Sequence, residues 1–193
     1  MRAFIGIALP QAVRSSLAAL QQQLAESQTD VKWVEEPNLH VTMRFLGEID
    51  DAQRQTIEQA LGIIAHGVKP FDLSLSRLGA FPSLGSPRVI WVGVGQGHEE
   101  LTQIAKRLEE RLVAAGLSGE DREFVAHVTL GRVRSSHHLG QLARSLKSAQ
   151  WQAPPPWTTT ALTLYKSELS SSGPRYMVLA EVPLAGAPKD AAR

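Results

Sequence analysis

Several features that mark common protein classes are missing from this sequence of 193 residues. It has no cysteine, which excludes disulfides, zinc–thiolate centres and thiol nucleophiles. Twenty basic residues stand against nineteen acidic ones, so the chain lacks the strong positive excess of proteins that coat nucleic acids. Any contact with nucleic acid should therefore be local, at one nucleotide or one strand end.

Long apolar runs are missing as well. No stretch approaches the roughly 18 apolar residues that span a bilayer. The short apolar segment 3–9 stops at Pro10 without a small-residue cleavage site, so we interpret it as a buried strand rather than a signal peptide. We expect a monomer in the cytoplasm, without membrane contact. Because no spacing resembles a zinc site, we also expect no metal and no cofactor.

The residues that are present indicate an ordinary globular domain, with 43% hydrophobic residues to build a core. Periodicity predicts helices at about 11–28, 50–67, 99–115 and 139–149. It predicts strands at 3–9, 39–46, 71–78, 89–94, 125–130, 161–169 and 176–182, with a Gly- and Pro-rich loop at 79–87. Short strands between helices favour the α+β class. We expect one domain over residues 1–184 and a disordered tail over residues 185–193.

One arrangement occurs twice along the chain: a helix, a strand that contains His-Val-Thr, and another helix. The two tripeptides occupy positions 40–42 and 127–129, so the histidines are 87 positions apart. Residues i and i+2 of a strand share a face, so each histidine should lie beside its threonine while the valine faces the core. The repeat predicts two similar lobes that face each other.

A histidine beside a hydroxyl group, present twice, is typical of phosphoester cleavage by general acid–base catalysis. One imidazole takes a proton from water and the other protonates the leaving oxygen, at a pH near the ordinary pKa of histidine. The hydroxyls of Thr42 and Thr129 would bind phosphate oxygens. A single His-x-Thr is more often a satisfied polar site on a half-buried strand. Two copies in the same context favour a catalytic pair, His40 and His127.

Beyond these motifs, the chain resembles a known family over nearly its whole length. The matching segments are Arg2–Ile7, Trp33–Val34, Asn38–Gly47, Gly79–Pro82, Pro87–Trp91, His127–Arg132, Leu164–Leu169 and Pro174–Tyr176. They resemble the 2H phosphoesterases, and within these the bacterial and archaeal RNA 2′,3′-cyclic phosphodiesterases, formerly called 2′-5′ RNA ligases.

The resemblance implies two pseudo-symmetric lobes, each an antiparallel sheet with outer helices, and an active-site cleft between them. It implies that His40 donates a proton to the departing 3′ oxygen, that His127 is the base acting on water, and that the product is a 2′-phosphate. The residues by themselves leave open which histidine is the acid.

Other side chains are weaker candidates for binding the substrate. Arg44 shares strand parity with the first motif, so it either reaches the phosphate or lies solvated at the rim. Arg132 has the opposite parity to the second motif, but Gly131 can break the strand, and the resemblance favours a phosphate contact. Tyr165 and Phe45 are candidates for stacking on a base. Parity places Phe45 on the core side, and we expect the tryptophans to pack in the core or between the lobes.

The expected activity is therefore hydrolysis of RNA ends, or nucleotides, that carry a 2′,3′-cyclic phosphate. An alternative with the same chemistry is ATP-independent 2′-5′ RNA ligation, in which a hydroxyl replaces water. A rival of another class is an RNA- or nucleotide-binding module without turnover, which the pair of histidines disfavours because binding needs no acid–base couple.

Overall fold

The computed structural model describes residues 1–170 and 173–186. Its helices are α1 (Gln11–Ala25), α2 (Asp51–His66), α3 (His98–Ala114) and α4 (Leu139–Ser148), with a 3₁₀ turn η1 (Glu36–Asn38). Its strands are β1 (Arg2–Ala8), β2 (Val31–Trp33), β3 (His40–Glu48), β4 (Phe71–Leu73), β5 (Leu75–Ser83), β6 (Ser86–Val94), β7 (His127–Val133), β8 (Trp157–Thr159), β9 (Ala161–Ser170) and β10 (Gly173–Pro183). The predicted α+β class is confirmed.

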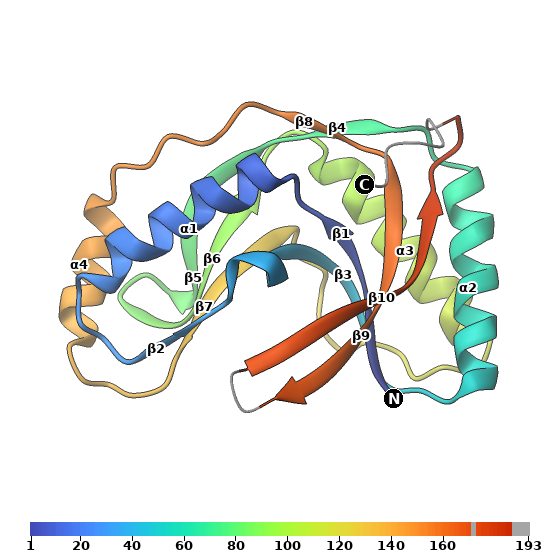
Figure 1. The fold of residues 1–193 in the computed structure, drawn as a ribbon, viewed down its shortest axis with the longest axis horizontal. Helices are drawn as coiled ribbons and strands as arrows, with labels where there is room; N and C mark the ends of the chain where they lie inside the picture. The colour runs from blue at the N-terminus through green and yellow to red at the C-terminus, as the bar shows by residue number, and fades with distance from the viewer. Residues whose placement is uncertain (171–172, 187–193) are drawn as a thin grey trace.

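All the described strands except β4 and β8 form one large antiparallel sheet made of two halves. Its order is β10-β9-β1-β3-β7-β6-β5, and β2 adds to β7. The halves meet at β3 and β7, where Val41 and Val128 are the one pair in register. Helices α2 and α3 lie on one side of the molecule, and α1 and α4 lie beside β5–β7 on the other (Figure 1). The predicted pair of lobes is thus present, joined by a narrow seam between the two motif strands.

Each lobe takes strands from both copies of the repeat. The first copy runs from β1 to β5 and the second from β6 to β9, with β1 equivalent to β6 and β3 to β7. The last strand of each copy pairs with the first strand of the other, because β9 pairs with β1 and β5 with β6. The short strands β4 and β8 also pair across the copies. This exchange ties the lobes into one unit.

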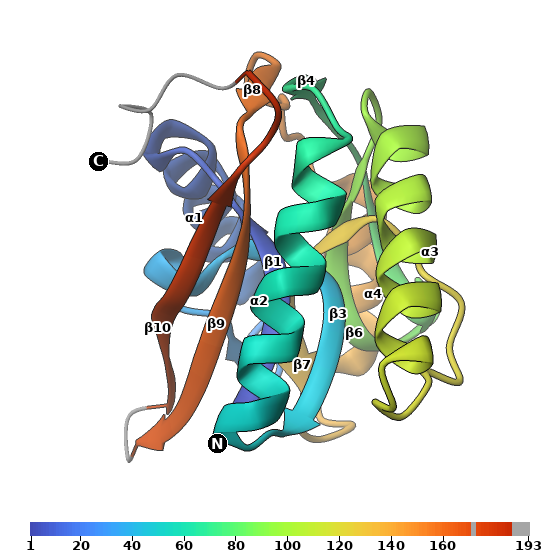
Figure 2. The same ribbon diagram turned by 90° about the vertical axis from the view of Figure 1, so that its right-hand side faces the viewer.

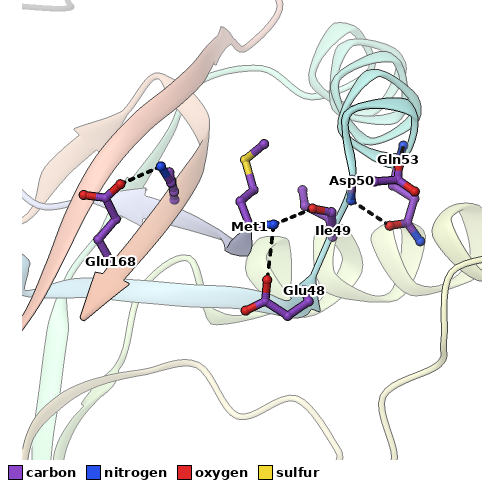
Figure 3. Close-up of polar contacts among 7 residues, drawn as sticks. Met1, Glu48, Ile49, Asp50, Gln53 and Glu168 are labelled. Carbon is purple, nitrogen blue, oxygen red and sulfur yellow. Dashed lines mark hydrogen bonds and ion pairs between the residues drawn. The ribbon is translucent and has the colours of Figure 1, made fainter.

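The helices form where the local sequence favours them. At α2 the Asp50 carboxylate accepts from the Gln53 amide, and the Gln53 side chain accepts from the Asp50 amide, which is a complete capping box (Figure 3). Beside it, the amino group of Met1 donates to the Ile49 carbonyl at 2.7 Å and contacts Glu48 at 3.2 Å. Figure 2 shows α2 between the β9–β10 hairpin and α3.

A single hydrophobic core extends through both lobes. Its members include Ile5 of β1, Leu61 of α2, Leu108 of α3 and Leu142 of α4, all fully buried. This continuity supports our proposal that residues 1–184 form one two-lobed domain. No helix within the described part of the chain has the length and apolarity needed to cross a bilayer.

Three expectations about local structure need correction. The predicted strand 71–78 is two strands in different sheets, since β4 pairs with β8 and β5 with β6. The predicted loop 79–87 is mostly a β-hairpin, whose register pairs Gly79 with Trp91 and Phe81 with Val89. The predicted tail does not begin at Ala185, whose amide donates to the carbonyls of Ala65 and Val68. The rest of that tail, residues 187–193, lies outside the described residues.

Candidate active site

The two His-Val-Thr motifs lie side by side at the seam between the lobes. Val41 and Val128 are fully buried, as predicted, while the histidines and threonines are half-buried on the opposite face of the sheet. In the antiparallel register set by the two valines, His40 lies across from Thr129 and Thr42 lies across from His127. The fold therefore gathers His40, Thr42, His127 and Thr129 on one face, which we call the cleft face.

Each motif is followed by a bulge that reverses the alternation of side chains. In β3 the register passes from Thr42 to Arg44 and skips Met43. In β7 it passes from Thr129 to Gly131 and skips Leu130. An extra residue on one strand moves every later side chain to the opposite face.

The bulge in β3 corrects two predictions. Arg44 does not share a face with His40: it is 3% exposed, its Nε lies 3.2 Å from Glu109 of α3, and its guanidinium donates to the carbonyls of Leu108 and Ser118. Arg44 therefore anchors α3 on the outer face and is not brought to the cleft. Phe45, predicted to face the core, is 55% exposed and lies on the cleft face.

The bulge in β7 likewise brings Arg132 onto the cleft face. Arg132 follows this bulge just as Phe45 follows the bulge in β3. Arg132 is exposed. Burial is the main cause that lowers the pKa of His127, and the positive charge of Arg132 adds to that lowering. Burial raises the pKa of Tyr176, and the charge of Arg132 partly opposes that rise. Its guanidinium is therefore close to groups from both lobes. Gly131 is a glycine because β2 packs on it, so a side chain there would strike Val31 and Trp33.

Both histidines hold one ring nitrogen against the backbone. Nδ1 of His40 lies 2.7 Å from the Asn38 carbonyl, and Nδ1 of His127 lies 2.6 Å from the Val125 carbonyl. A carbonyl only accepts, so each Nδ1 carries the hydrogen and each Nε2 is left for proton transfer. Nε2 of His40 lies 2.8 Å from the Thr42 hydroxyl, whereas Nε2 of His127 has no partner among the described residues.

The surroundings of the two imidazoles disfavour their charged forms. Burial lowers the pKa of His40, the hydrogen bond to Asn38 raises it, and the nearby His127 lowers it further. For His127, burial again lowers the pKa most, with a smaller contribution from Arg132. The electrostatic effect of His127 on His40 agrees with the strand register, which places the two motifs side by side. An anion bound between them would oppose these shifts and favour protonation.

Aromatic rings surround His40. Its ring centroid is 4.7 Å from Phe4, 5.3 Å from Tyr176 and 6.1 Å from Tyr165, and Tyr176 stands edge-on at 90°. Tyr165, a predicted site residue, also stacks on Phe4 at 5.0 Å, and burial raises its pKa. Tyr176 was not singled out as a candidate. The chain contains two tyrosines, and both lie beside this histidine.

His127 has its own aromatic neighbours, which sequence reasoning also missed. Phe81 stands edge-on to it at 5.5 Å, and Trp91 lies at 6.1 Å. Phe81 occupies in β5 the position that Tyr165 occupies in β9, so the two lobes offer similar rings to both histidines. Trp91 was expected to pack in the core or between the lobes. It lies beside His127 instead, and its buried indole Nε1–H has no partner in the described structure.

A groove lies outside this site. It measures about 710 Å³, lies between α2 and α3 on the outer side of the fold, and is lined by Ile63, Arg107 and Arg111 among others. Within residues 1–170 and 173–186, no group of three or more His, Cys, Asp or Glu side chains could hold a metal ion. The groups that the cleft face can offer an anionic ligand are therefore two imidazoles, two threonine hydroxyls and the guanidinium of Arg132.

Comparison with known proteins agrees with the repeat within the chain. The model of the family described as "LigT like Phosphoesterase" matches the chain twice, at residues 7–91 and 92–176, one match for each copy of the repeat. The RNA 2′,3′-cyclic phosphodiesterase of Aeropyrum pernix is 36% identical over 166 residues, which cover 86% of this chain and 93% of that protein. The enzyme of the same name from Methanothermobacter thermautotrophicus is 30% identical over 176 residues, covering 91% and 95%.

Solved structures share the whole fold. A protein of Thermus thermophilus superposes with a TM-score of 0.78 at 27% identity, covering 96% of this chain and 99% of that one. Escherichia coli LigT complexed with 3′-AMP superposes with a TM-score of 0.75 at 27% identity, covering 95% and 97%.

Proposed function

Because this chain belongs to the LigT-like phosphoesterase family, we propose that it hydrolyses RNA 2′,3′-cyclic phosphate ends to a 2′-phosphate. The observation that carries the proposal is the pair of histidines on one face, each with Nδ1 held by a carbonyl and Nε2 left for proton transfer. Relatives at 30–36% identity bear the name of this activity. LigT structures complexed with nucleotides support a nucleotide as the ligand of this fold.

We propose that His127 is the base and His40 the acid. His127 is the more open of the two, and its Nε2 has no partner in the described structure, so it can accept a proton from solvent water. As that proton leaves, the water oxygen bonds to phosphorus and the bond from phosphorus to O3′ breaks. His40, held at Nδ1 and enclosed by aromatic rings, protonates O3′. The 2′-phosphate remains.

Thr42, Thr129 and Arg132 would then bind the phosphate. The Thr42 hydroxyl contacts Nε2 of His40 in the free protein. With substrate bound, it would donate its one hydrogen to a charged phosphate oxygen instead, which leaves Nε2 for the proton that His40 transfers. Arg132 brings the one guanidinium that the bulge turns to the cleft face, and it suits the charge that builds on phosphate oxygens. Tyr165 and the exposed Phe45 are positioned to contact the nucleoside.

An oligonucleotide ending in a 2′,3′-cyclic phosphate tests this proposal directly. We expect conversion to the 2′-phosphate isomer, identified by phosphorus NMR, at the same rate with and without EDTA, because side chains carry both proton transfers. Loss of the rate in EDTA, with recovery on adding one divalent ion, would contradict the metal-free mechanism. Adding an acceptor RNA with a free 5′-hydroxyl distinguishes ligation, which would yield a longer strand, and no turnover at all would indicate a binding module.

The pH dependence of the rate should show the ionisation of both histidines. The base must be neutral and the acid protonated, so kcat/KM should follow a bell whose limbs report the free pair. Burial lowers both pKa values, so this bell should lie to the acid side of one set by unperturbed histidines. Bound phosphate raises the pKa of the acid, so the kcat profile should extend further on its alkaline side. Profiles of both constants check this. A rate that climbs steadily with no alkaline limb would rule out His40 as the acid.

A further inference from the structure

The residue two positions before His40 contacts two other elements at once, β3 and β10. Asn38 ends η1 immediately before β3, and it is 9% exposed. Its carbonyl accepts from Nδ1 of His40 at 2.7 Å. Its side-chain Nδ2 donates to the carbonyl of Pro174 in β10, also at 2.7 Å. One buried residue therefore bonds both the imidazole and the β9–β10 hairpin, which is 136 positions away along the chain.

The other motif shows that this side chain is not needed to hold a histidine by its backbone. Val125 stands two positions before His127, and its carbonyl makes the same contact with Nδ1 at 2.6 Å. Its side chain is apolar and 41% exposed, so it fastens no second element by a hydrogen bond. Asn38 thus adds a link that the pseudo-equivalent position lacks.

The hydrogen bond from Asn38 to Pro174 reaches the β9–β10 hairpin, which covers His40. The β9–β10 hairpin carries Tyr165 and Tyr176, which lie 6.1 and 5.3 Å from the imidazole. β1 contributes Phe4 at 4.7 Å, and the Phe4 ring packs against both tyrosines. β10 is an edge strand: it pairs with β9 on one side, and within the described sheet no strand pairs with its other side. The sheet therefore restrains β10 on one side only. A hydrogen bond from η1 to Pro174 near the start of this strand restrains it.

We propose that Asn38 is a positioning residue, which fastens the β9–β10 hairpin over His40 so that the two tyrosine rings orient and enclose the imidazole. The inference rests on the proposed function, in which His40 is the acid. Asn38 does not touch the reacting atoms. It acts through the hairpin and through the imidazole that the hairpin covers.

Release of the hairpin has a definite electrostatic consequence. The groups that face His40 are Thr42, His127 from β7, Tyr165 from β9 and Tyr176 from β10. The charges of Arg132 and Arg2 reach Tyr176. Burial is the main cause that lowers the pKa of His40, so loss of the tyrosine cover should raise that pKa toward its ordinary value. The rings beside His127, Phe81 and Trp91, come from other strands and should stay in place.

Asn38→Leu tests the proposal, because leucine has a similar shape but no donor for Pro174. Thr29→Val is the matched control, because it also removes a hydrogen bond from a buried side chain to a distant carbonyl, that of His138, without touching His40 or the β9–β10 hairpin. We expect Asn38→Leu to lower kcat by about 10- to 100-fold, the usual effect of a small misplacement of reacting groups. In side-chain NMR of ¹³C-labelled histidine, His40 should titrate at higher pH than in the wild-type protein while His127 moves less. Thr29→Val should leave kcat and both titrations close to wild type.

Two further measurements separate the possible failures. Tyr176→Leu removes one covering ring while keeping Asn38, so it should shift the His40 titration in the same direction even if Asn38→Leu folds poorly. Wild-type kcat and an unchanged His40 titration in folded Asn38→Leu would overturn the proposal. A lower melting temperature without a change in kcat or in the His40 titration would overturn it as well. The NMR titration needs no turnover, so it still tests Asn38 if the protein fails to hydrolyse cyclic phosphates.

Discussion

Replacing either His40 or His127 with alanine is expected to lower kcat by roughly 10² to 10⁴, the usual contribution of one general acid or base. Each imidazole is held at Nδ1 and presents Nε2 on the cleft face, so no neighbouring group can take over its proton transfer without moving. Turnover should be measured on a 2′,3′-cyclic nucleotide, with thermal melting to confirm folding. His66→Ala is a matched control, since His66 is exposed at the end of α2.

The double variant makes the test sharper. Two groups that act in one proton-transfer couple are strongly non-additive, so His40→Ala/His127→Ala should be only slightly slower than the slower single variant. Fully multiplicative losses would indicate two independent roles. Near-wild-type turnover in either folded single variant would remove that histidine from the mechanism.

Much of the fold can be predicted because its signals are local. The stripe of Ile57, Leu61 and Ile64 and the capping box at Asp50 define α2, and the structure starts and ends this helix within a residue of the expected positions. The repeat of His-Val-Thr likewise predicts two related lobes without any long-range information. Such features depend on side-chain periods of 3.6 or 2, which a single chain displays directly.

The remaining differences come from interactions between distant segments. Gly79 and the prolines near it suggest a loop, but Gly79 lies within a strand because the ring of Trp91 covers it from β6. The strand 71–78 breaks near Ser74 because its first part pairs with β8, a segment far along the chain. No local pattern specifies either partner. For the same reason Tyr176 and Phe81 were not recognised beside the histidines.

The bulges had the largest effect on the candidate site. Strict alternation after Thr42 places Arg44 on the cleft face and Phe45 in the core, and the extra residue Met43 reverses both assignments. A bulge has no reliable signature in one sequence, since the skipped residues, Met43 and Leu130, are ordinary strand formers. The break expected near Gly131 did bring Arg132 to the cleft face, although the bulge itself skips the residue before the glycine.

Arg132→Ala is expected to lower kcat/KM by roughly 10² to 10³, the typical cost of removing one donor that stabilises charge in the transition state. Arg132 follows the β7 bulge and is exposed. Its charge acts on the pKa of His127 in one lobe and of Tyr176 in the other. Arg134→Ala is the matched control, because Arg134 is also exposed and lies just beyond β7. Arg132→Lys keeps the charge but loses the two-pronged donor, so its activity should fall between the wild type and the alanine variant.

The pH profile separates this role from a structural one. Arg132 contributes to lowering the pKa of His127, so its removal should raise that pKa. The base must be neutral to act, and the acid limb of the kcat/KM profile should therefore move to higher pH in Arg132→Ala, while Arg134→Ala keeps the wild-type limb. A variant that loses activity with an unmoved acid limb and a lowered melting temperature would show that Arg132 supports the fold. Full activity in Arg132→Ala would exclude it from the phosphate site.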